Sequence, residues 1–172
     1  MEKIYNILIR YILIFILGLG KLIIFYKVFF FPTFFGSTTL LSLFGDVYKI
    51  YSANYFIYNT IAVNLINACI AGSAYYLLFI LLFSTPEIKI NQRIKILVII
   101  FLSFLVLNII RIVLMTLLIG NKYFKEIHLF FWYVISTLFV ICIWFSAVKI
   151  FKIKEIPIYS DLKYLLKVIN KK

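Results

Sequence analysis

The sequence predicts an all-α membrane protein with about four transmembrane helices, and composition and the arrangement of apolar runs are the observations behind this. Of the 172 residues, 65% are hydrophobic and only 14% are charged, which lies far outside the range of soluble domains. The three prolines, Pro32, Pro86 and Pro157, stand at the edges of the apolar runs. Because a bilayer core requires about 20 apolar residues per helix, these runs are candidates for spans.

Basic residues predict which loops face the cytoplasm. The formal net charge is +12, and the Lys and Arg residues flank apolar runs, which favours anionic lipid headgroups as partners over nucleic acid. Most of them lie in the N-terminus, the 85–95 loop and the C-terminal tail. These three segments are therefore expected in the cytoplasm, and residues 33–66 and 120–127 outside.

The four expected spans belong to one membrane domain, residues 1–172. They cover residues 7–31, 68–83, 96–119 and 129–148. The first is the least regular, because Lys21 interrupts it and Arg10 lies near its start, so both side chains must extend toward opposite faces. It lacks a small-residue cleavage site, which favours a retained helix over a removed signal peptide.

Two segments outside the spans have patterns of their own. Residues 33–66 are rich in Tyr, Thr and Asn, and the 51–63 stretch, with Asn54 as a turn candidate, predicts a short hairpin-like segment at the outer surface. The cytoplasmic tail, residues 149–172, places leucines and lysines at helical spacing after Ser160 and Asp161. It predicts a C-terminal amphipathic helix on the membrane with these two residues as its cap.

Three polar residues fall near the same membrane face: Cys69, Arg111 and His128, the only histidine. At about 1.5 Å of rise per residue, each lies roughly 24 to 32 Å from the cytoplasmic end of its helix. Taken singly, each has an ordinary interpretation: an arginine reaching headgroups, an interfacial histidine and a small hydrophobic cysteine. Cys142, between two isoleucines, is interpreted as such a hydrophobic residue.

Together, the three residues supply what thiol chemistry requires. Cys69 offers a nucleophile, His128 a proton acceptor and Arg111 a donor for developing oxyanion charge. A helix that begins near Ala68 would place Cys69 in its first turn, where the helix dipole favours a thiolate. Asn108, three residues before Arg111, is expected either to orient the site or to make an interhelical hydrogen bond.

The pattern resembles the archaeosortase and exosortase family of membrane transpeptidases. The resemblance is carried by Cys69 at an outer helix start, the Asn-Ile-Ile-Arg-Ile run at residues 108–112, and His128 opening the last helix, in that order. It covers roughly residues 55–150. One departure is a glycine that stands two residues after the cysteine in many members; here that position is Ala71, and the glycine is Gly72.

The resemblance implies a function and its participants. Such enzymes cleave a C-terminal sorting signal on secreted proteins and transfer the new carboxyl end to a lipid acceptor, with no metal or organic cofactor. Cys69 would be the nucleophile, His128 the acid and base, and Arg111 the oxyanion stabiliser. Two alternatives stay open, a non-enzymatic membrane subunit for transport or assembly and a purely hydrolytic cysteine protease. The sequence does not indicate an oligomeric state.

Overall fold

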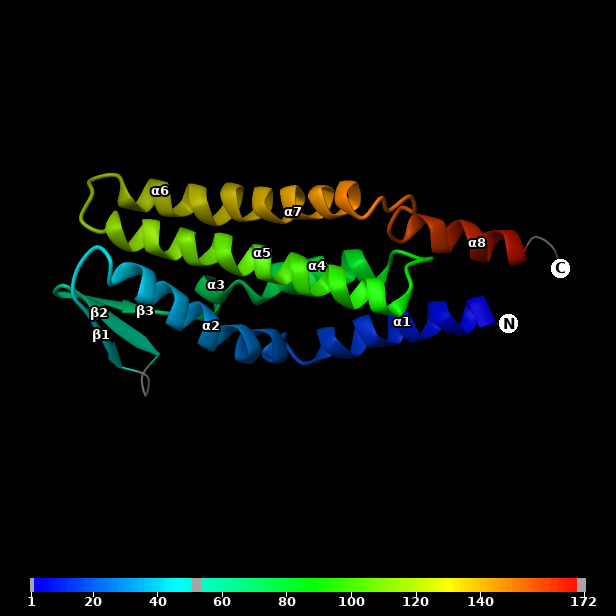
Figure 1. Cartoon of the computed structure of the whole chain (residues 1–172), viewed down its shortest axis with the longest axis horizontal. Helices are drawn as coiled ribbons and strands as arrows, with labels where there is room; N and C mark the ends of the chain where they lie inside the picture. The colour runs from blue at the N-terminus through cyan, green and yellow to red at the C-terminus, as the bar shows by residue number, and fades with distance from the viewer. Residues whose placement is uncertain (1, 51–53, 170–172) are drawn as a thin grey trace.

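The computed structural model describes residues 2–50 and 54–169, which form an elongated helical bundle with a small sheet at one end (Figure 1). We call this the sheet end, and the end at which both termini lie the terminal end. The helices are α1 (Glu2–Leu19), α2 (Ile23–Leu41), α3 (Asn67–Ile70), α4 (Gly72–Phe83), α5 (Ile90–Leu117), α6 (Phe124–Phe130), α7 (Ser136–Ile150) and α8 (Tyr159–Ile169), with a π-helical turn η2 (Phe131–Ile135) between α6 and α7. The strands are β1 (Val47–Ile50), β2 (Tyr55–Tyr58) and β3 (Ile61–Asn64).

Three helices in the described part of the chain are long and apolar enough to cross a membrane. They are α2, α5 and the continuous run Phe124–Ile150, whereas the apolar helical stretch Asn67–Phe83 is shorter. Apolar side chains remain exposed on α5 at every fourth position from residue 94 to residue 114, which forms a stripe along one face. Such a stripe is unfavourable in water and suits a lipid environment. The fold therefore supports membrane association.

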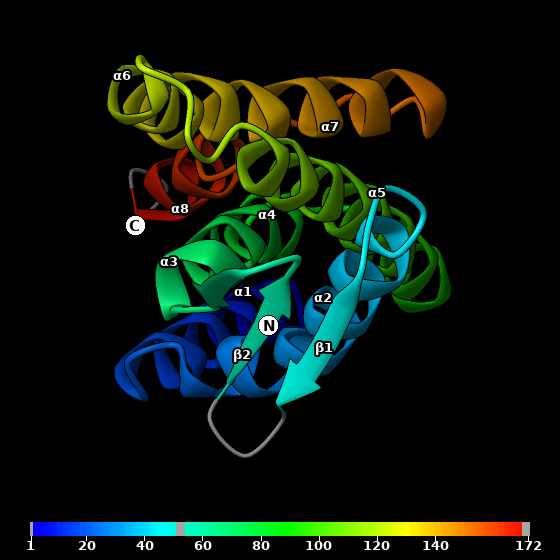
Figure 2. The same cartoon turned by 90° about the vertical axis from the view of Figure 1, so that its left-hand side faces the viewer.

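Helix α5 is the central element of the bundle. It packs against α2, α4 and α7, and the pair α4 and α5 lies between α7 on one side and α1 with α2 on the other (Figure 2). Its inward face carries Ile96, Ile100 and Phe104, each at most 1% exposed. Tyr75 of α4 stacks on Phe29 of α2 with ring centroids 3.6 Å apart, so aromatic packing ties these helices together.

The expected span over residues 7–31 is wrong, because the structure contains two helices there. Lys21 and Leu22 adopt left-handed backbone conformations with φ of 49° and 60°, and this ends α1 before α2 begins. The glycines at positions 18 and 20 weaken the helix just before this break. Pro32 lies inside α2 and does not end it, since the following residues stay helical to Leu41 and two of them, Phe34 and Leu41, are buried in the core.

A three-stranded antiparallel sheet occupies the segment for which a hairpin was expected. The order is β1-β2-β3, with Tyr58 paired to Val47 on one side and to Ile61 on the other. The fold is therefore not purely α-helical. Asn54, the expected turn residue, is a turn residue with φ of 57° in the connection from β1 to β2, and a second turn, with Asn59 at φ of 52°, joins β2 to β3. Residues 51–53 of the expected hairpin lie outside the described residues.

Buried side chains of β2 hold the sheet against the bundle. Phe56 is fully buried and packs edge-on against Phe34 of α2, with ring centroids 6.1 Å apart. Ile70 of α3 and Ile112 of α5 belong to the same buried cluster. The sheet is thus anchored next to the short helix that carries Cys69.

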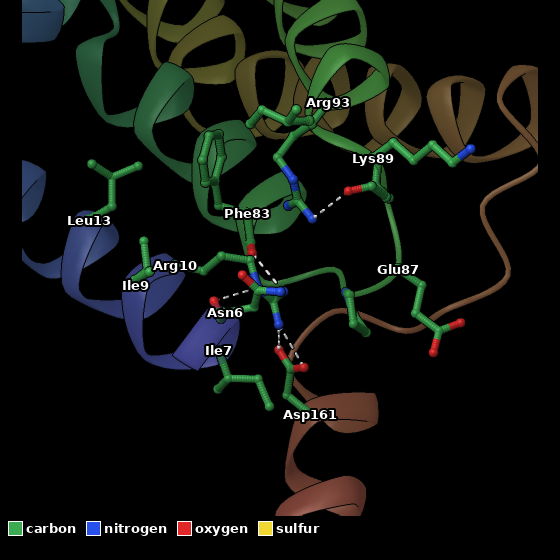
Figure 3. Close-up of a pocket in the computed structure, with 13 residues that line it drawn as sticks. Asn6, Ile7, Ile9, Arg10, Leu13, Phe83, Glu87, Lys89, Arg93 and Asp161 are labelled. Atoms are coloured by element: carbon green, nitrogen blue, oxygen red, sulfur yellow. Dashed lines mark hydrogen bonds and ion pairs between the residues drawn. The ribbon is translucent and has the colours of Figure 1, made fainter. Parts of the chain in front are cut away.

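At the terminal end, an ion pair joins the first and last helices. Arg10 Nη2 donates to both carboxylate oxygens of Asp161 at 2.8 Å, and Arg10 Nη1 donates to the Phe83 carbonyl at 3.0 Å (Figure 3). Arg93 adds a bond to the Thr85 carbonyl at 2.8 Å. Asp161 is therefore a buried ion-pair partner within α8 and not the expected helix cap, because α8 begins two residues earlier.

The other helix boundaries also differ from expectation at the sheet end. The expected fourth span over residues 129–148 begins earlier, at Phe124, so that His128 lies in the second turn of α6 instead of opening the helix. The expected span over residues 68–83 is divided between α3 and α4 at Ala71. Both changes matter for the candidate site described next.

Candidate active site

Cys69 lies in the four-residue helix α3, which a left-handed residue separates from α4. Ala71 has φ of 57° and ψ of 41°, so the chain turns between Ile70 and Gly72. The expectation that Cys69 occupies the first turn of a long membrane helix is therefore wrong. The helix dipole that was expected to favour a thiolate is the dipole of α4, and Cys69 lies before the first residue of α4. Ala71 stands where the resembling family often carries glycine, the residue that adopts this conformation without strain.

Asn108 and Arg111 of α5 hold the carbonyl groups of α3. Asn108 Nδ2 donates to the Cys69 carbonyl at 2.9 Å, and Arg111 Nη2 donates to the Ala68 and Cys69 carbonyls at 3.3 Å each. A helix as short as α3 leaves its last carbonyls without partners in its own backbone. Residues three apart on α5 supply those partners, as their shared helix face allows. The backbone at Cys69 is thereby fixed relative to α5.

Ser136 joins Arg111 to the last long helix, and the sequence analysis missed it. Arg111 Nη1 donates to Ser136 Oγ at 2.6 Å, and Ser136 Oγ donates to the Phe131 carbonyl at 3.0 Å, five residues earlier. This spacing is that of the π-helical turn η2, a feature often found at functional sites. The signal available in the sequence was the Ser136-Thr137 pair, which interrupts an apolar stretch of the last long helix near the expected height of Arg111.

The three predicted residues line one cavity at the sheet end. This cavity of about 320 Å³, which we call the thiol cavity, is bounded by α3, α5, α6 and β3, and Cys69, Arg111 and His128 are all in its wall. Cys69 is half-buried, Arg111 is buried and His128 is exposed. Within the described residues, no hydrogen bond joins the Cys69 sulfur to the His128 ring, which lies beside the Phe124 ring with centroids 5.7 Å apart. A substrate group in this cavity would have a thiol, an imidazole and a guanidinium on its walls.

Arg111 is buried without an acidic partner. It is 7% exposed, and its bonds go to one hydroxyl and two carbonyl oxygens, all neutral. No carboxylate among the described residues lies within ion-pair distance of it, in contrast to Arg10 with Asp161. A buried charge of this kind is costly unless an anion completes it. The arrangement is suited to a group that carries or develops negative charge.

The remaining candidates do not join this site. Cys142 is exposed on α7 and lies outside the thiol cavity. The described residues contain no group of three or more His, Cys, Asp and Glu side chains arranged to hold a metal ion.

No family model, curated protein or solved structure matches the chain. The functional argument therefore depends on the geometry of the site and on its resemblance to one family.

Proposed function

We propose that this chain is a membrane cysteine transpeptidase of the archaeosortase and exosortase type. The observation that carries the proposal is the thiol cavity, whose wall contains Cys69, His128 and Arg111 from three separate helices. These are the nucleophile, the acid and base, and the oxyanion donor that acyl transfer requires. The proposed substrate is a C-terminal sorting signal on secreted proteins, and the proposed acceptor is a lipid-linked amine.

The reaction proceeds through a thioester. The Cys69 sulfur, after its proton passes to His128, attacks the carbonyl carbon of the scissile peptide, and the carbon–sulfur bond forms as the carbon–nitrogen bond breaks. His128 returns the proton to the leaving amine. The acceptor amine then attacks the thioester, gives its proton to His128, and releases the Cys69 thiolate. Binding of substrate must bring the His128 ring to the sulfur, since proton transfer needs hydrogen-bond distance.

Arg111 has donors left for the oxyanion. A guanidinium carries five N–H groups, and three of its bonds go to Ser136, Ala68 and Cys69. These bonds fix the guanidinium next to the Cys69 backbone, and donors fixed in advance are what stabilisation of developing charge requires. Asn108 is a positioning residue, because it acts on the Cys69 backbone and not on the substrate.

In the proposed topology four segments cross the membrane and the sheet end lies outside the cytoplasm. The basic residues concentrate at the terminal end, in the 85–95 loop and in the tail from residue 149, which the positive-inside rule assigns to the cytoplasm. The thiol cavity is then extracytoplasmic, where secreted proteins arrive. Protease protection of a C-terminal tag in sealed right-side-out vesicles tests this orientation; digestion of the tag would contradict it.

Substitution of each cysteine tests the chemistry. In cells that express the chain with a substrate bearing a sorting signal, Cys69→Ala is expected to abolish processing, and Cys142→Ala, the matched control, to leave it unchanged. Full processing by Cys69→Ala would end the enzyme hypothesis and leave the non-enzymatic subunit. Mass spectrometry of the product's C-terminus separates transfer from hydrolysis, since a lipid adduct and a free acid differ in mass.

A further inference from the structure

A second cavity shares a wall with the thiol cavity. It is a groove of about 480 Å³ between α4 and α7, which we call the lateral groove. Both cavities are lined by Ala68, Arg111 and Trp132. Arg111 therefore lies between the lateral groove and the thiol cavity. An occupant of the lateral groove would lie one residue from Cys69. The two cavities are therefore neighbours, separated by residues that line both.

Charge singles out one end of the lateral groove. Arg111 is the only charged residue in its lining, and the described residues offer this guanidinium neutral acceptors only. At the same end lies Ser136, whose hydroxyl accepts from Arg111 at 2.6 Å. An arginine guanidinium is a common binding group for phosphate. The groove thus has one end suited to an anion.

The rest of the groove changes from polar to apolar along its length. On α4, Ser73 near the helix start is followed one turn later by Leu77, and both line the groove. On α7, Thr137 is followed one turn later by Ile141 in the same way. The spacing of four residues within each pair corresponds to about 6 Å along the helix axis. Both walls therefore place hydroxyls beside Arg111 and aliphatic side chains further toward the terminal end.

This gradient matches the structure of a lipid. We propose that the lateral groove binds a membrane phospholipid, with its phosphate on Arg111 and an acyl chain along Leu77 and Ile141. The phosphate supplies the counter-charge that Arg111 otherwise lacks. The binding itself does not depend on catalysis, but the role of this lipid as the transfer acceptor rests on the proposed function. Only Ala68 would then separate the lipid headgroup from the thioester on Cys69.

A lipid explains the groove better than an apolar helix of a protein. A helix would fill the aliphatic part equally well, but it would leave the buried guanidinium without an anion. Burying a cation without a partner is unfavourable by several kcal/mol in general. The charge at the end of the groove therefore favours the phosphate-bearing occupant, and the competing helix becomes one outcome of the test.

Native mass spectrometry of the purified full chain in detergent tests the proposal. The probes are dioleoylphosphatidylglycerol, dioleoylglycerol with the same chains but no phosphate, and inorganic phosphate. Retention of the phosphatidylglycerol should exceed that of dioleoylglycerol at least about tenfold, as expected for a charged hydrogen bond. Inorganic phosphate at equal concentration should not displace it, because it lacks the acyl chain.

Groove variants locate the binding. Thr137→Trp fills the groove and should abolish retention, whereas Leu138→Trp, the neighbouring lipid-facing position outside the groove lining, should retain lipid like the wild type. Arg111→Gln should weaken retention of the phospholipid about tenfold and leave dioleoylglycerol unchanged. If Thr137→Trp fails to fold, as judged by its circular dichroism spectrum, Ile141→Trp replaces it.

Three results would overturn the proposal: equal retention of the two lipids, displacement by free phosphate, or undiminished retention in the folded groove variant. Displacement of phospholipid by an apolar helical peptide that binds Arg111→Gln as tightly as the wild type would assign the groove to a protein helix. None of these measurements uses turnover. Cys69→Ala should keep the lipid while losing processing, so failure of the proposed function and failure of this proposal are distinguishable.

Discussion

Asn108→Leu separates the role of Asn108 in the site from its role in stability. The side chain is 1% exposed; its Nδ2 donates to the Cys69 carbonyl at 2.9 Å, and its Oδ1 has no hydrogen-bond partner among the described residues. Leucine has the same number of side-chain heavy atoms and the same branching. The substitution therefore removes one hydrogen bond and one buried, unpaired oxygen while keeping most of the packing.

These two effects oppose each other. Loss of the Asn108 hydrogen bond costs about 1 kcal/mol, and no more, because the Cys69 carbonyl still accepts from Arg111 at 3.3 Å. Removal of the unpaired oxygen returns about 1 to 3 kcal/mol. The free energy of unfolding of Asn108→Leu should therefore equal that of the wild type or exceed it by up to about 2 kcal/mol. Substrate processing should nevertheless fall about tenfold, because the Cys69 carbonyl loses the shorter of its two hydrogen bonds from α5 side chains.

Two assays on the same protein test this reasoning. Unfolding in mixed micelles with increasing sodium dodecyl sulfate, followed by circular dichroism, gives the change in stability, and conversion of a co-expressed substrate gives the rate. The matched control is Asn108→Ala, which removes the same bonds but leaves a void and should lower both quantities. A stability loss of more than about 2 kcal/mol in Asn108→Leu, or unchanged processing, would refute the assigned role.

Other predictions address the backbone, the ion pair and Arg111. Ala71→Gly should raise the free energy of unfolding by about 1 kcal/mol in the same micelle assay, since glycine adopts a φ of 57° without strain; a decrease would contradict the strain argument. Asp161→Asn should lower it by about 3 kcal/mol and speed hydrogen exchange in α8, because Arg10 loses a bidentate partner at 2.8 Å. The double variant with Arg10→Gln should recover part of that loss, and additive losses would show that the pair is uncoupled. Ser136→Ala should slow processing several-fold with little change in substrate binding, since Arg111 loses its 2.6 Å acceptor; equal activity would exclude a positioning role.

Much of the architecture could be predicted from the sequence, because hydrophobic content acts over whole segments. The apolar runs around α2, α5 and α7 are long and apolar enough to cross a membrane, whatever their exact boundaries. The segment boundaries depended on weaker forces. The break at Lys21 and the continuation of α2 through Pro32 result from competition between local backbone preference and packing, which composition does not resolve.

The three-stranded sheet also could not be predicted from single segments of the sequence. Strands β2 and β3 lie within the stretch that was expected to form a hairpin, but β1 pairs with β2 across a connection that includes residues 51–53, and Phe56 is buried because α2 provides Phe34 opposite it. Strand pairing is a long-range choice that local propensity only weakly constrains. The expected turn residue Asn54 lies between β1 and β2, and the second turn, at Asn59, follows from the pairing of β2 with β3.

For the candidate site, the sequence by itself determined depth along the helices, since a fixed rise per residue converts position into height. It thereby brought Cys69, Arg111 and His128 to one layer. Only the tertiary structure decided rotation: which faces of α3, α5 and α6 meet, that Arg111 contacts Ser136 and the α3 carbonyls, and that a lateral groove lies behind the same guanidinium. Helix rotation about the bundle axis depends on how side chains of all neighbouring helices interlock, and no single segment of sequence contains that information.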